Sequence, residues 1–398
     1  MKRNQFEPAR QAGELALLSE IRRRAARASG GGLRPNGGLR LGIGDDCALL
    51  APRRDEELAI TTDLSIAGHH FRLDWHQPEA VGHRALARGL SDLAAMGARP
   101  VAAFLSLGLP RLLTVASGRR RAWVQRFLDG LLALAEAHKV PLAGGDLAES
   151  SVAVADIVLV GAVARGRALL RSGAKPGDLL YVTGALGGAA AGLARLGELA
   201  AEKIRILGEI GEEHPSGAKA QVDFAALSAR LKSCPDAYCG SDKSFSAACE
   251  AQPGQPNPPR IPRKLEALLA PHLYPQPRIA QGLWLQRRGL ASAALDLSDG
   301  LSTDLAHLCE ESGVAAEVDA ALLPLCLGAN LAQALHGGED YELLFTAPPT
   351  ARLPRAIDCV PITRIGRVVK LRRGRPAVTL ITEQGAQPLE ARGWEHFY

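Results

Sequence analysis

Hydrophobic residues in the first part of the chain follow two alternating patterns. Short runs typical of strands, such as residues 58–62 and 156–164, are separated by long stretches rich in alanine and leucine. The stretch over residues 78–96 is long enough for a helix and is typical of one. From residue 39 to about residue 163 the sequence therefore predicts a mixed fold, α/β or α+β.

A second alternating region begins at a strand predicted over residues 178–183, which leads into a glycine-rich turn at residues 184–188. At about 150 residues per domain, the chain is long enough for two or three units. We expect an N-terminal α/β domain over residues 1–165. A C-terminal α/β domain is expected over residues 166–398.

The pattern breaks down between about residues 199 and 262. Charged and small residues give way to sequence rich in proline, which ends at Asn257-Pro258-Pro259. Residues 200–210 could form part of a helix. We interpret the whole segment as a flexible surface insertion in the C-terminal domain, since its composition does not suggest a buried core.

Composition and charge exclude several classes of protein. Hydrophobic residues make up 47% of the chain and charged residues 22%, and the net charge is +5, which gives little support to nucleic-acid binding. The basic cluster Arg22-Arg23-Arg24 is typical of a solvated helix face. Apolar stretches fall short of the ~18 residues that a membrane helix needs, and Glu14 and Glu20 interrupt the first apolar run. We expect an amphipathic N-terminal helix in a cytoplasmic protein.

Cysteine spacing argues against a disulfide framework and against a zinc site. The seven cysteines are scattered along the chain without a Cys-x-x-Cys pair, so we expect reduced thiols. They are Cys47, Cys234, Cys239, Cys249, Cys309, Cys326 and Cys359.

Acidic residues recur in short motifs where predicted strands or turns end. Gly44-Asp45-Asp46 precedes a strand, Thr61-Thr62-Asp63 ends the next one, and Gly144-Gly145-Asp146 follows an apolar run. The segment 296–300, Asp-Leu-Ser-Asp-Gly, ends a further strand. Each motif alone could be a simple turn, but solvated surface does not explain the recurrence.

Asp92 differs from the others because it lies inside the predicted helix, between Leu90 and Leu93. Burying a carboxylate without a partner would cost several kcal/mol, and a bound cation would remove that cost. Oxygen ligands without a His/Cys cluster favour magnesium, which binds carboxylates together with substrate phosphates. The motifs therefore predict a site for several magnesium ions.

Glycines beside the carboxylates would let backbone N–H groups approach phosphate oxygens. Phosphoryl transfer needs mainly positioning and charge neutralisation, so we expect direct in-line transfer without a covalent nucleophile. The chain lacks the P-loop motif and the His-Arg-Asp and Asp-Phe-Gly motifs of protein kinases.

Taken together, these motifs resemble the thiamine-monophosphate kinase family. The resemblance covers the chain from about residue 13 to residue 398 except the insertion, and its motifs occur in the family's order. They are residues 42–50, 61–63, 68–71, 90–97, 144–146, 171–178, 296–300 and 337–343.

The resemblance implies the two-domain fold of the aminoimidazole-ribonucleotide synthetase superfamily. Its N-terminal sheet domain dimerises, its second domain is α/β, and the active site lies between them. The implied reaction is ATP-dependent and magnesium-dependent phosphorylation of thiamine monophosphate to thiamine diphosphate, the last step in making that cofactor. The implied partners are these two substrates and a second copy of the chain, without nucleic acid or membrane.

The resemblance also implies roles for particular residues. Gly145, Asp146, Arg171 and Ser298 would bind ATP, and His70, Glu339 and Trp394 would bind thiamine monophosphate. The magnesium ligands would be Asp46, Thr61, Thr62, Asp63, Asp92, Asp146, Asp296 and Asp299.

For several of these residues, a structural role is an alternative to the role in substrate binding. Arg171 suits a polyphosphate but could pair with a surface carboxylate, and Trp394 could stack on a cationic ring or be a hydrophobic anchor. His70 could be structural, and Glu339 could belong to a turn. Where the family often has a Tyr near the adenine, this chain has Leu128.

Two alternatives remain at this stage. Sister enzymes of the superfamily share the ATP and magnesium residues, although selenophosphate synthetase would carry a reactive residue near its N-terminus, and the hydrogenase-maturation enzyme would end in a Cys-bearing tail. The purine-pathway synthetase is less easily dismissed. A nucleotide-binding regulatory protein would have lost its acidic motifs, whereas this chain retains them.

Overall fold

The computed structural model describes residues 14–28, 38–43, 46–116, 121–212 and 263–393. Within these ranges the chain divides into two compact units. The first comprises Met1–Gly89 and Pro100–Ala162, and the second comprises Leu90–Arg99 and Val163–Tyr398. No helix in the described ranges is long and apolar enough to cross a membrane.

The first unit is built on a sheet with the strand order β3-β6-β4-β5. Strands β4 and β5 are parallel, and Gly145 lies opposite Leu105 in their register. The first unit contains β1 (Leu39–Leu41), β2 (Leu49–Leu50), β3 (Glu56–Ile66), β4 (Arg99–Leu109), β5 (Leu142–Glu149), β6 (Val154–Ala164), α1 (Glu14–Ala28), α2 (Pro78–Ala95), η1 (Arg111–Thr114) and α3 (Trp123–Ala137), except that residues 90–95 of α2, Arg99 of β4 and the end of β6 belong to the second unit.

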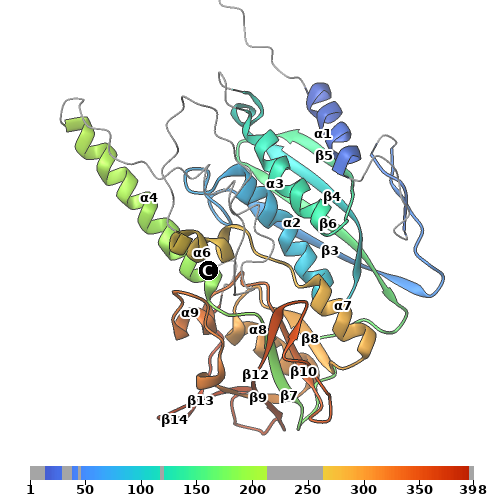
Figure 1. Cartoon of the computed structure of the whole chain (residues 1–398), viewed down its shortest axis with the longest axis vertical. Helices are drawn as coiled ribbons and strands as arrows, with labels where there is room; N and C mark the ends of the chain where they lie inside the picture. Colours follow the sequence, from blue (N-terminus) through green and yellow to red (C-terminus); the bar gives the residue numbers. More distant parts are fainter. Residues whose placement is uncertain (1–13, 29–37, 44–45, 117–120, 213–262, 394–398) are drawn as a thin grey trace, which may run out of the picture. The chain divides into compact units, whose positions relative to one another are not determined.

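Helices α2 and α3 lie side by side at very short range (Figure 1). A Cβ atom at Gly82 would lie 1.9 Å from the carbonyl oxygen of Phe127, and one at Gly130 would lie 1.8 Å from that of Glu79. Glycine at both positions therefore permits an approach that no other residue would allow.

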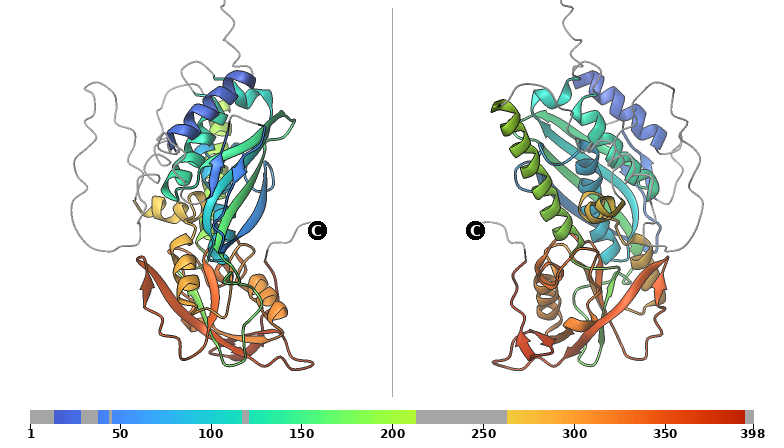
Figure 2. Two further views of the ribbon diagram at one scale, coloured as in Figure 1. Left: turned by 90° about the vertical axis from the view of Figure 1, so that its right-hand side faces the viewer. Right: turned by 60° about the vertical axis from the view of Figure 1, so that its left-hand side comes forward.

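Helix α1 confirms the predicted amphipathic helix. Leu17, Ile21 and Ala25 are buried at a spacing of four residues, which places them on one face. Arg22 and Arg23 are exposed. α1 and α3 lie on the same side of the sheet (Figure 2).

The second unit is built on a sheet with the order β14-β13-β9-β12-β7-β10-β8, to which β11 adds beside β12. Strand β10 lies antiparallel to both β7 and β8, and β13 runs parallel to β9. The second unit contains β7 (Leu179–Thr183), β8 (Ala293–Asp296), β9 (Ala315–Asp319), β10 (Leu343–Ala347), β11 (Ala356–Ile357), β12 (Val360–Val369), β13 (Val378–Thr382), β14 (Gly385–Pro388), α4 (Gly188–Glu212), α6 (Arg263–Leu273), α7 (Ile279–Arg288), α8 (Leu301–Ser312), η2 (Ala320–Leu322) and α9 (Leu331–His336).

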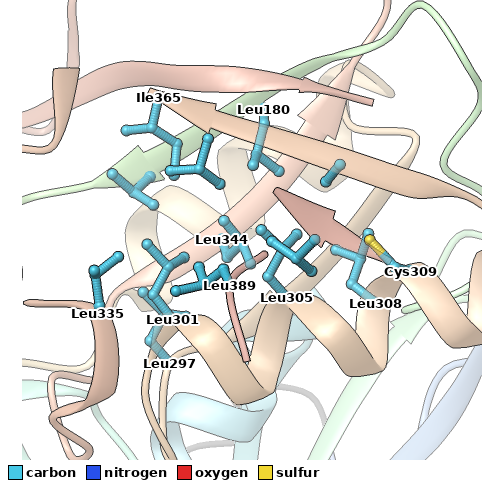
Figure 3. Packing of buried hydrophobic residues seen from close by; sticks show 14 of the residues in the cluster. Leu180, Leu297, Leu301, Leu305, Leu308, Cys309, Leu335, Leu344, Ile365 and Leu389 are labelled. Carbon is cyan, nitrogen blue, oxygen red and sulfur yellow. The ribbon is translucent and has the colours of Figure 1, made fainter. Parts of the chain in front are cut away.

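The core of the second unit forms where α8 packs on this sheet (Figure 3). Leu301, Leu305 and Leu308 share one helix face and contact a cluster that includes Leu180 and Leu344 from the strands. Full burial of such a side chain contributes about 1.5–3 kcal/mol. This packing anchors the first turn of α8, which borders the candidate site.

Helix α4 extends into the first part of the predicted insertion. The helix continues through residue 199 to Glu212, and Leu196 and Leu199 are buried. Residues 200–210 are therefore helical, as one of our alternatives had it, and α4 packs closely on α6 at Gly192. The rest of the predicted insertion, residues 213–262, lies outside the described residues.

Candidate active site

The motif Thr61-Thr62-Asp63 lies inside β3, not at the end of a strand as we predicted. The strand continues through the apolar residues Leu64 and Ile66. Because side chains alternate along a strand, Thr61 and Asp63 share one face and Thr62 points to the other. Thr62 donates a hydrogen bond of 3.0 Å from Oγ1 to Oδ1 of Asp156. The structure thus brings Thr61 and Asp63 together but not Thr62.

Asp63 is fixed by helix α2. Its Oδ1 lies 3.6 Å from Nε of Arg88. A Cβ atom at the next residue, Gly89, would lie 3.5 Å from Oδ2 of Asp63. The carboxylate of Asp63 therefore lies beside the cationic side chain of Arg88 and near the backbone of Gly89, where no side chain intervenes.

The motif Gly144-Gly145-Asp146 lies within β5. Gly145 has a φ of +147°, and a Cβ atom there would lie 1.8 Å from the carbonyl oxygen of Leu105. Only glycine fits at this position. The backbone just before Asp146 therefore departs from regular strand geometry. Asp146 is exposed, as is Asp46, which lies between β1 and β2.

His70 lies in the loop after β3 and is half-buried. Its Nδ1 accepts a hydrogen bond of 3.1 Å from the backbone N–H of Ile66. The next residue, Phe71, is buried and stacks on Trp123 with ring centroids 6.3 Å apart. The loop is therefore held at both residues.

Further along this loop, His76 is buried and stays neutral. Burial, followed by the positive charge of Arg84, lowers the pKa of His76 to about 3. In the same loop, Arg72 lies over the ring of Trp75, 4.5 Å from its centroid.

In the second unit, Asp296 ends β8 as predicted and is buried. Its Oδ2 accepts a hydrogen bond of 2.6 Å from Oγ of Ser91, which is also buried. Asp92 is half-buried, which corrects our expectation of a buried carboxylate. On helix α2, Asp92 therefore directly follows a serine that binds Asp296.

Asp304 on α8 holds the turn that follows Asp296. Its Oδ2 accepts hydrogen bonds from the backbone N–H groups of Asp299 at 3.1 Å and Gly300 at 3.0 Å. Burial and the neighbouring negative charge of Asp299 raise the pKa of Asp304 to about 7. The turn carrying Asp299 and Ser298 is therefore rigid, and both of these residues are half-buried.

The loop 337–342, which we call the acidic loop, runs along this turn. The backbone N–H of Glu339 donates to the carbonyl oxygen of Ser298 at 2.7 Å, and that of Tyr341 donates to Leu297 at 2.9 Å. The N–H of Leu297 in turn donates a hydrogen bond of 2.8 Å to the carbonyl oxygen of Glu342. These bonds extend the pairing of β8 and β10, and they bring Glu339 to the same turn as Asp296, Ser298 and Asp299.

Two carboxylates of the acidic loop point away from Glu339. Asp340 accepts hydrogen bonds from the backbone N–H groups that begin α4, while Glu342 forms an ion pair with Arg278. Burial, together with the nearby charge of Glu342, raises the pKa of Asp340 to about 7, although the N–H donors act in the opposite direction.

Arg171 is exposed in the segment before β7, and its carbonyl oxygen accepts a hydrogen bond of 2.8 Å from Ser312 on α8. Its positive charge also acts on Asp304. Trp394 lies outside the described residues. The backbone N–H of Gly393, just before it, donates a hydrogen bond of 3.0 Å to Oγ1 of Thr303.

The predicted magnesium ligands belong to both units. Within the described ranges, no group of three or more His, Cys, Asp or Glu side chains stands in a geometry that could by itself hold a metal ion. Each unit nevertheless offers hard oxygen donors of the kind that magnesium prefers. The pKa of Asp304 is raised mainly by burial and further by the neighbouring negative charge of Asp299.

Sequence reasoning missed several residues that shape the site. Ser91, Asp304 and Asp340 are adjacent to predicted ligands or one helical turn away, which is the signal that could have found them. Arg278 carried no such signal, because its partner Glu342 is distant in sequence. Leu128, noted beside the expected adenine pocket, is fully buried in α3.

Comparison with known proteins gives consistent matches. Residues 44–168 match the model of the AIR synthase related protein, N-terminal domain. A thiamine-monophosphate kinase of Escherichia coli (strain K12) is 36% identical over 373 residues, which cover 90% of this chain and 92% of the relative.

Solved structures agree with this match. The crystal structure of thiamine-monophosphate kinase from Stenotrophomonas maltophilia K279a superposes with a TM-score of 0.64 at 33% identity, covering 92% of this chain and 96% of that one. A structure described as AaThiL complexed with AMPPCP and TMP gives a TM-score of 0.62 at 28% identity, covering 99% of this chain and 100% of that one.

Proposed function

Because this chain belongs to the thiamine-monophosphate kinase family, we propose that it transfers the terminal phosphoryl group of ATP directly to thiamine monophosphate, giving ADP and thiamine diphosphate. One observation carries the proposal: the backbone pairing of the acidic loop with the 296–300 turn. It gathers carboxylates suited to a metal-bound polyphosphate and a carboxylate suited to a cationic acceptor at one edge of the sheet. ATP as co-substrate suits a cytoplasmic location.

Magnesium would be held by Asp296, Asp299 and Asp92 from the second unit. From the first unit it would be held by Asp46, Thr61, Asp63 and Asp146. When bound, the ions would neutralise the charge of the transferring phosphate. Thr62, on the opposite face of β3, stays a prediction from the resemblance.

The protein's own groups would bind and orient the two substrates. Arg171, exposed beside α8, suits a phosphate oxygen because its planar guanidinium donates from several N–H groups. Gly145 and Ser298 would contact ATP near Asp146 and Asp299 respectively. Such positioning lowers the barrier by holding the attacking and leaving oxygens in line.

Thiamine monophosphate carries a positively charged ring, and Glu339 supplies a half-buried carboxylate that would attract it. His70, whose Nδ1 is already engaged by Ile66, would present its other ring edge to the substrate. Trp394 stays a prediction from the resemblance, since it lies outside the described residues.

The test is release of ADP from ATP by the purified full-length chain. We expect release only with thiamine monophosphate and magnesium, and not with free thiamine as acceptor. Asp299→Asn should reduce turnover by about 100-fold or more, whereas Asp319→Asn, a cap of η2 in the same unit, should not. Full activity after removal of magnesium, or equal turnover of free thiamine, would refute the proposal.

We also propose that the chain forms a homodimer through β3. This strand is an edge of its sheet, and Leu58, Ile60 and Leu64 on one face are 40%, 67% and 46% exposed. An exposed apolar edge strand is a surface that proteins usually cover. In sedimentation experiments Ile60→Asp should convert a dimer into a monomer, while Leu112→Asp, at an exposed leucine outside the sheet, should not. A wild-type monomer would contradict this assignment.

A further inference from the structure

The glycine-rich turn before α4 has the features of an anion-binding loop, but the chain fills it with its own carboxylate. Oδ2 of Asp340 accepts a hydrogen bond of 2.6 Å from the N–H of Gly187, and Oδ1 accepts one of 3.1 Å from Ala189. The N–H groups at the start of a helix lack helical partners and favour negative charge. Asp340 therefore caps this helix start with its own side-chain oxygens.

The residues on either side of Asp340 have unusual backbones. Glu339 has a φ of +67° and Tyr341 a φ of +51°, a region that costs residues other than glycine roughly 1–2 kcal/mol each. Such conformations persist only where the surroundings impose them. The side chain between them, bound to α4, is one such restraint.

Neighbouring contacts leave Glu339 little backbone freedom. Its N–H is bound to the carbonyl oxygen of Ser298 at 2.7 Å. A Cβ atom at Gly338, just before it, would lie 2.6 Å from that oxygen. After Asp340, Glu342 is held by Arg278 at 2.5 Å. The backbone conformation of Glu339 is thus set by its neighbours.

We infer that Asp340 is a positioning residue for the acceptor substrate. By occupying the N-terminus of α4, it holds Glu339 in the left-handed backbone conformation from which the Glu339 carboxylate meets the cationic ring of thiamine monophosphate. This inference rests on the proposed function, in which Glu339 binds that substrate.

The test replaces Asp340 by Asn, which keeps the shape but has one acceptor oxygen in place of two. Calorimetry with thiamine monophosphate should show a dissociation constant at least about tenfold weaker, equivalent to the ~1.4 kcal/mol of one good hydrogen bond. The KM for thiamine monophosphate should rise similarly, while kcat and the binding of an ATP analogue change less than about twofold. The control Asp319→Asn removes a carboxylate cap elsewhere in the unit and should change neither constant.

A double-mutant cycle tests whether Asp340 acts through Glu339. In a Glu339→Gln background, Asp340→Asn should weaken acceptor binding by less than about twofold, because the group that it positions is gone. An additive effect, or equal weakening of both substrates, would overturn the inference.

A second variant keeps the test decisive if Asp340→Asn fails to fold. Asp340→Ser also keeps a capping oxygen, and loss of folding in both variants would make Asp340 a residue of stability only, which overturns the inference. A wild-type chain that binds no thiamine monophosphate would refute the proposed function as well. Normal binding by the folded Asn variant would refute this inference alone.

Discussion

Ser91 on α2 donates a hydrogen bond of 2.6 Å to Oδ2 of Asp296 at the end of β8, although 205 positions separate them in the sequence. Both residues are buried, so water cannot readily replace the bond. Since Asp296 is a proposed magnesium ligand, Ser91 sets the orientation of a carboxylate that must meet the ion.

We expect Ser91→Ala to raise the magnesium concentration for half-maximal activity by about tenfold, because a hydrogen bond to a charged group contributes about 1.5–3 kcal/mol. Direct calorimetric titration with magnesium should show the same shift. The matched control is Ser292→Ala, which removes a bond of 2.6 Å to Asp178, outside the proposed site. If both variants change magnesium binding equally, Ser91 has no special role.

Asp92→Asn should lower activity by at least about 100-fold if Asp92 binds magnesium. Stability should change little or rise, because carboxylates without metal repel one another. Thermal melting with and without magnesium, set beside turnover of the same samples, distinguishes this from a structural role. A variant that melts early yet keeps normal turnover per folded molecule would show that Asp92 is structural.

The pair of Arg278 and Glu342 should contribute to stability. The Glu342 side chain is 5% exposed and that of Arg278 18%, so Arg278→Met leaves a buried carboxylate and should lower the free energy of unfolding by about 3 kcal/mol. Urea unfolding measures the change, and adding Glu342→Gln should recover part of it. Arg195→Met breaks an exposed pair and should cost less than about 0.5 kcal/mol. Equal losses would contradict the prediction.

His76 should make the fold sensitive to acid. Its pKa is lowered from 6.5 to about 3 by burial and by Arg84, so below pH 6.5 the unfolded chain takes up a proton that the folded chain refuses. Stability contributed by neutral His76 is therefore fully present above pH ~6.5 and is lost as the pH falls toward ~3. His76→Asn retains an acceptor for the N–H of Arg72 and should flatten the profile of unfolding free energy against pH. A profile as steep as that of the wild type would refute the assignment, and exposed His69→Asn serves as control.

Much of the architecture could be predicted because its signals are local. Apolar periodicity gave α1 and α2, and the strand ending at Asp296 was recognised from its buried run and the turn that follows. Predictions failed where a strand is atypical: Thr61, Thr62 and Asp63 interrupt β3 with polar residues, so its length was underestimated.

The contacts that build the site could not be predicted, because they join residues remote in sequence. Nothing near Ser91 indicates Asp296, and nothing near Arg278 indicates Glu342. Asp340 shows a further difficulty, since its carboxylate binds backbone N–H groups of the protein itself although it lies in an acidic motif that suggests ligand binding.

The pairing of β8 with β10 has a consequence for how this site can evolve. Asp296 lies opposite Leu343 in the register, and the same ladder continues to Glu339. A shift of one residue in either strand reverses which face every side chain occupies. A single-residue deletion in either strand would therefore disturb the geometry between the proposed metal-binding and acceptor-binding carboxylates, so the two strands must be inherited as one unit of fixed length.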